Sequence, residues 1–188
     1  MRILLTISVS LLMFACREKQ SLPKPRAFPR VEYPERSYID YQSATCPFTF
    51  QYPSYAELNA KDKDCWFDLF MTSFNARLHC SYIPIKNREE FDNLIRDAFQ
   101  IGDRINERAN YQEEFKVNNK LGVGGLMMEW SGPAASSVHF FLTDTTQHFF
   151  KAALYYDSKV RPDSLAPITD FIKEDINHMI ATFKWLDK

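Results

Sequence analysis

The chain has 188 residues and a formal net charge of −1, with 15% aromatic residues and only five glycines. This composition supplies enough apolar material for one domain with a real core, and it excludes an intrinsically disordered chain. Residues 17–37 hold six Lys or Arg against three Glu and the remainder is acidic, so nucleic acid is not an expected partner.

The first segment in chain order, residues 1–15, is predicted to be a lipoprotein signal peptide. The apolar run over residues 3–14 follows a positively charged start and ends in Ala15 and Cys16. This is the pattern of a secretory leader, and a cysteine at the first mature position is the acceptor for lipid, including palmitate. A transmembrane helix would need about 20 apolar residues, and this run gives way to Arg17 too soon. Lipidation is therefore expected at Cys16.

A proline-rich tether is expected over residues 16–37. It contains four prolines among many charges, a composition that favours an extended polyproline II chain. Docking of Phe28, Tyr33 or Tyr38 onto the domain or a partner is the alternative. Arg17 follows the lipid cysteine where an inner-membrane retention signal would usually show Asp, which favours the periplasmic face of the outer membrane.

Three cysteines remain after Cys16. Residues 76–82 alternate apolar and polar side chains, which directs Cys80 inwards as a buried thiol. Export to an oxidising compartment makes a disulfide between Cys46 and Cys65 the expected pair. Closing this loop of about 20 residues would stabilise the fold by roughly 3 kcal/mol.

One α+β domain is expected over residues 38–188, with a largely antiparallel sheet of about 6–8 strands flanked by two long helices. Asn87 and Glu90 form a capping pair for the first helix, predicted over about residues 87–109. Ser164 is the expected N-cap of the second, over 164–183, with Pro167 in its first turn. The expected strands cover residues 46–53, 55–59, 65–71, 76–83, 113–117, 122–130, 137–143 and 148–156.

Several separated blocks of this sequence resemble the GldD family of gliding-motility lipoproteins. They lie at residues 23–26, 46–48, 65–66, 134–144, 153–155, 163–167, 171–175 and 183–185. The resemblance implies a Bacteroidetes cell-envelope lipoprotein needed for gliding and the linked type IX secretion system. It implies machinery proteins as partners, no known enzymatic activity and no catalytic residues to carry over. A looser likeness, in fold only, is to PsbP/Mog1-type domains.

The sequence offers no motif for catalysis, a metal or a cofactor, so none of these and no small-molecule substrate is expected. His79 and Cys80 are strand neighbours whose side chains point to opposite faces, which argues against a thiol dyad. Neither His-x-x-x-His nor Cys-x-x-Cys occurs. Two alternatives remain open: a ligand-binding envelope lipoprotein with an aromatic-lined pocket, and a hydrolase. The hydrolase would need Ser, Cys or Asp partners beside His79, His139 or His148 in one cleft.

Overall fold

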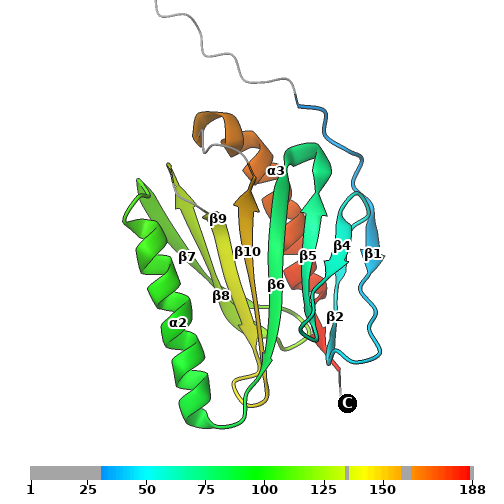
Figure 1. The fold of residues 1–188 in the computed structure, drawn as a ribbon, viewed down its shortest axis with the longest axis vertical. Coiled ribbons are helices and arrows are strands. Elements are labelled where there is room, and N and C mark those ends of the chain that lie inside the picture. Colours follow the sequence, from blue (N-terminus) through cyan, green and yellow to red (C-terminus); the bar gives the residue numbers. More distant parts are fainter. Residues whose placement is uncertain (1–30, 134–135, 158–161, 187–188) are drawn as a thin grey trace, which may run out of the picture.

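Strands with alternating side chains form a seven-stranded antiparallel sheet at the centre of the fold (Figure 1). The computed structural model describes residues 31–133, 136–157 and 162–186. Backbone alone is described for 162–164. Across the sheet the strands run β4 (Glu57–Ala60), β5 (Trp66–Met71), β6 (Ala76–Pro84), β10 (His148–Tyr156), β9 (Ser136–Thr143), β8 (Gly124–Ser131) and β7 (Tyr111–Asn118). The α+β class with a largely antiparallel sheet is therefore confirmed.

The first face of the sheet carries the main core and packs against helix α3 (Pro162–Thr182). Its strands contribute fully buried side chains such as Leu78, Leu154 and Phe150, and the helix contributes Ile172 and Met179. Such a face removes large apolar side chains from water, each worth about 1.5–3 kcal/mol. This layer is the main source of stability.

Two small sheets close the edge of this core. β1 (Tyr38–Asp40) pairs with β3 (Gln51–Pro53), and β11 (Lys184–Trp185) pairs with β2 (Phe48–Thr49). The single strand expected over residues 46–53 is therefore wrong. The chain changes partner at Phe50, whose carbonyl accepts a hydrogen bond from the Tyr41 amide at 2.7 Å. A 3-10 turn, η1 (Thr72–Phe74), joins β5 to β6.

Helix α3 begins two residues before the expected N-cap Ser164, so that expectation is wrong. Pro162 occupies the first helical position, which suits proline because no intrahelical donor is lost there. Pro167 consequently lies in the second turn, where it cannot donate to the carbonyl four residues earlier. Its side chain is exposed.

Helix α2 (Arg88–Asn106) covers part of the second face and contacts β8 and β9. The expected N-cap is confirmed, because Asn87 Oδ1 accepts a hydrogen bond from the Glu90 amide at 2.9 Å. The helix ends three residues before the expected Ala109. It packs through one apolar cluster around Phe91, Phe141 and Phe149 and a second around Ile105, Met128 and Trp130.

Residues 31–37, expected to belong to the tether, pack against the domain. The Tyr33 ring lies 4.8 Å from that of Phe171, and Arg36 forms ion pairs with Glu174 and Asp175. Tyr38 stacks on His178 at 3.7 Å, so docking of Tyr33 and Tyr38 is what the structure shows. Residues 16–30, including Phe28, lie outside the described residues.

Across the part of the chain that the structure describes, no helix is both long enough and apolar enough to span a membrane.

Candidate functional site

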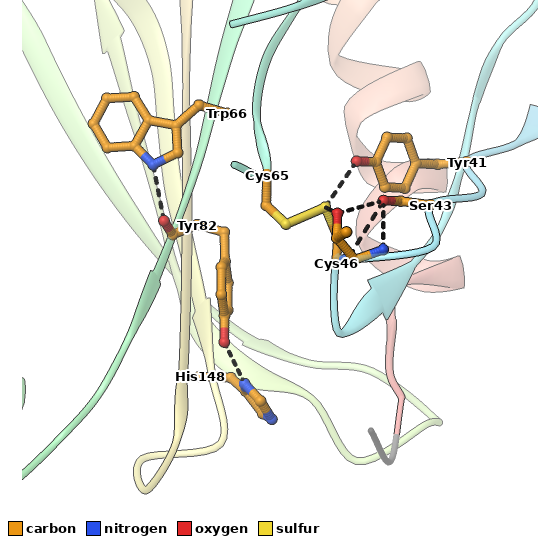
Figure 2. The surroundings of a disulfide bond; sticks show 8 residues. Tyr41, Ser43, Cys46, Cys65, Trp66, Tyr82 and His148 are labelled. Carbon is orange, nitrogen blue, oxygen red and sulfur yellow. Dashed lines mark hydrogen bonds between the residues drawn. A yellow bond between two sulfur atoms is a disulfide. The ribbon is translucent and has the colours of Figure 1, made fainter. Parts of the chain in front are cut away.

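The disulfide joins the small-sheet layer to the start of β5 (Figure 2). The Cα atoms of Cys46 and Cys65 are 5.5 Å apart, and the Tyr41 hydroxyl donates to Cys46 Sγ at 3.3 Å. Cys80 is the free cysteine of the described residues, and burial followed by the nearby Asp68 charge raises the pKa of its thiol. The disulfide and the buried Cys80 thiol therefore have a structural role. Cys16 lies outside the described residues, so its lipidation stays a prediction.

Beside the disulfide, two aromatic side chains link β5, β6 and β10. Trp66 Nε1 donates to the Tyr82 carbonyl at 2.9 Å, and the Tyr82 hydroxyl lies 2.8 Å from His148 Nδ1 (Figure 2). His148 also stacks on Trp185 of β11 at 4.9 Å. His148 is thus held in a packing role at the edge of the core.

A buried carboxylate organises the polar part of the second sheet face. Asp68 is 4% exposed and stands opposite His79 in the β5–β6 register. Its oxygens lie 2.6 Å from His79 Nδ1 and 2.5 Å from Lys61 Nζ. The more distant Arg77, at 3.9 Å, also pairs with Asp157 at 2.8 Å. The charges of Lys61 and Arg77 compensate the burial of a carboxylate that would otherwise be costly.

The His79–Asp68 pair fulfils one of the conditions set for a hydrolase. A catalytic triad also needs a nucleophile within hydrogen-bond reach of the histidine. Ser81 lies on the same strand face, and no hydrogen bond joins it to His79 in the structure. Cys80 is buried on the opposite face, as expected from the alternation. The pair can orient His79 but has no activated nucleophile among the described residues.

A cavity of about 240 Å³ lies beside this cluster, between α2 and the second face of the sheet. It extends from His79 on β6 across β10 to His139 on β9 and Met128 on β8. Helix α2 supplies Ala98 and Ile101 to its wall. The remaining lining residues are Ser81, Phe140, Phe141, Lys151, Ala152, Ala153 and Tyr155. This is the candidate functional site.

His139 is the unusual side chain of the cavity. It is 8% exposed, its ring lies 5.2 Å from Trp130 and 6.0 Å from Tyr155, and its Nε2 is buried without a hydrogen-bond partner. Burial, followed by the charge of Lys151, lowers the pKa of His139 to about 4. The imidazole is therefore neutral near pH 7, with one polar nitrogen unsatisfied.

Sequence reasoning did not find this arrangement. Asp68 reaches His79 across two strands, and the pairing depends on a register that single-strand patterns do not specify. For His139 the sequence gives one signal, a histidine within an otherwise apolar strand. Among the residues with described placement, no group of three or more His, Cys, Asp or Glu side chains could hold a metal ion.

The model of the family described as "Gliding motility lipoprotein GldD" matches residues 18–185. No curated protein matches the chain significantly. Among solved structures, the solution structure of cyanobacterial PsbP (CyanoP) from Synechocystis sp. PCC 6803 is similar, at 11% identity and a TM-score of 0.45. That match covers 81% of this chain and 94% of the cyanobacterial one.

Proposed function

The chain belongs to the GldD family of gliding-motility lipoproteins, and from this premise we propose that it is a non-enzymatic structural or assembly subunit. Its partners are other proteins of the gliding machinery and of the linked type IX secretion system. The observation that carries the proposal is the family match over nearly the whole mature chain, residues 18–185.

The geometry of the polar side chains supports a structural role. Asp68 is held by Lys61, Arg77 and His79, His148 by Tyr82 and Trp185, and His178 by Gln51 and Tyr38. Each of these groups links separate elements of the fold. Side chains in such contacts stabilise the fold, which suits a protein that binds other subunits.

The proposed location is the periplasmic face of the outer membrane, through lipid on Cys16. The tether is the proline-rich segment expected over residues 16–37, of which Tyr33 and Arg36 contact the domain. A polyproline II chain rises about 3.1 Å per residue, so a fully extended chain from Cys16 to residue 30 would span roughly 45 Å. The domain would then stand within the periplasm, close to its anchor.

The test is a clean deletion of the gene, followed by complementation, with gliding speed and secretion of a type IX cargo measured on the same cells. Loss of both, restored by the wild-type chain, is expected. A deletion strain that glides and secretes normally would contradict the proposal.

A second complementation experiment tests the non-enzymatic role. Complementation with His79→Gln or Ser81→Ala removes the groups that most resemble a catalytic pair. Both variants should restore gliding and secretion when their level in the envelope matches that of the wild type. A folded variant at normal abundance that restores neither would indicate chemistry at this site.

A further inference from the structure

The second sheet face is only partly covered. Helix α2 packs on β8 and β9, and Ala98 belongs to one of its two apolar clusters while Ile101 borders the other. These two residues form the helix wall of the 240 Å³ cavity. His79, whose side chain is 43% exposed, lies at the outer margin of the lining, so the cavity is accessible from solvent.

The lining divides into an apolar part and a polar part. Ala98, Ile101, Met128, Phe141 and Ala153 present hydrocarbon, sulfur and an aromatic ring. Such a surface favours the methylene groups of a ligand, because each one removed from water contributes about 0.8 kcal/mol.

The polar part is positively charged. Lys151 lines the cavity and forms no ion pair with any other described residue. It lies close enough to His139 for its charge to disfavour the imidazolium. His139 also belongs to the lining, but its Nε2 is buried away from the open space of the cavity. Lys151 therefore supplies the ammonium group that an anionic ligand can reach.

We propose that this cavity binds a small anionic amphiphile, a single short hydrocarbon chain or ring that ends in a carboxylate. The carboxylate lies at the Lys151 ammonium group, and the hydrocarbon lies against Ala98, Ile101 and Met128. The ammonium group donates a charge-assisted hydrogen bond to the carboxylate.

Size limits the ligand further. The cavity has a volume of about 240 Å³. Pockets for drug-sized ligands run from about 300 to 1,000 Å³. The site therefore fits a single short chain and not a membrane lipid with two acyl chains. This inference goes beyond the proposed function and does not depend on it.

The test is an NMR titration of the mature chain from residue 16, carrying Cys16→Ser so that no detergent is needed. Octanoate is the probe, octan-1-ol is its neutral counterpart, and anionic phosphatidylglycerol vesicles are a third arm. Octanoate should shift the amide signals of Ala98, Met128, His139 and Ala153 and saturate. Octan-1-ol should bind at least ten-fold more weakly, because it lacks the charge.

Three results with the unmodified cavity would overturn the proposal. The first is that octan-1-ol binds as tightly as octanoate, and the second is that octanoate shifts only signals from other parts of the molecule. The third is that octanoate causes no saturable shift, which would mean that the cavity holds only water. Equal shifts with the vesicles would overturn the assignment to a free single-chain ligand.

Variants sharpen the result. Lys151→Met keeps the length of the side chain without its charge and should weaken octanoate binding at least ten-fold. Lys116→Met, at an exposed position on β7, is the matched control and should bind like the wild type. Ala153→Leu fills the cavity and should abolish binding while the spectrum stays dispersed. Unchanged octanoate affinity in a folded Lys151→Met protein would contradict the site.

Discussion

His139 couples the stability of the fold to pH. The pKa of this group falls from an ordinary value of 6.5 to about 4, because burial and then the charge of Lys151 disfavour its protonated form. Between pH 7 and pH 5 the unfolded chain therefore takes up a proton that the folded chain does not. The free energy of unfolding should fall by about 2 kcal/mol from this group over that range.

His139→Phe should remove this part of the pH dependence, and urea unfolding at pH 7, 6 and 5 measures it. Tyr155→Phe is the control, because it changes a ring of the same cavity whose pKa is raised by burial and which does not titrate in this range. It should keep the wild-type slope. A His139→Phe variant with that same slope would contradict the assignment.

The disulfide makes a second contribution at the residue scale. Replacing Cys46 and Cys65 together with Ala should lower the free energy of unfolding by about 3 kcal/mol, because the unfolded chain is no longer cross-linked. Urea unfolding with and without reductant gives the measurement. Reductant should bring the wild-type protein close to the double variant and leave the variant unchanged. Equal stability of the oxidised wild type and the variant would show that the bond constrains little.

At the scale of elements, the sequence predicts well what local chemistry controls. Asn87 and Glu90 mark the start of α2, and alternation marks β6, β9 and β10 to within one residue at each end. The errors arise where partners far away in the chain decide. The strand over residues 46–53 splits because β11 claims one half and β1 the other. The early start of α3 has a different, local cause, because Pro162 suits the first helical position.

The docked segment over residues 31–37 depends on contacts with α3. Arg36 lies over the Phe171 ring at 4.1 Å, donates to the Phe171 carbonyl at 3.0 Å and pairs with the buried Asp175. Arg36→Met removes the charge and should cost about 1 kcal/mol, since hydrogen bonds to charged groups contribute more than neutral ones. Hydrogen exchange of residues 31–38 should become faster than in the wild type.

The control for this segment is Arg96→Met, at an exposed position on α2 where the guanidinium bonds only Asn93 among the described residues. Exchange of residues 31–38 should be unaffected there. If Arg36→Met also leaves the exchange unaffected, the aromatic contacts of Tyr33 and Tyr38 hold the segment without the arginine.

At the scale of the whole molecule, the candidate site could not be predicted because it belongs to no single element. Strand alternation places His139 and Lys151 on the same sheet face once the register is known. The extent to which α2 covers that face depends on helix packing, with the close approach of Gly102 to Met128 and Trp130 as one contact. A cavity that remains beside a helix reflects all of these distances together.

Anchoring and folding should be separable, because the buried core residues of the described part of the chain run from Tyr41 to Phe183, well after the predicted lipid acceptor Cys16. Cys16→Ser should abolish palmitate labelling, release the chain from the membrane fraction and stop gliding. The thermal midpoint of the purified domain should stay unchanged. Arg17→Asp is the matched variant. It should keep the palmitate label and the thermal midpoint of the wild type but move the protein to inner-membrane fractions. A Cys16→Ser chain that is still labelled and membrane-bound would contradict lipidation at this residue.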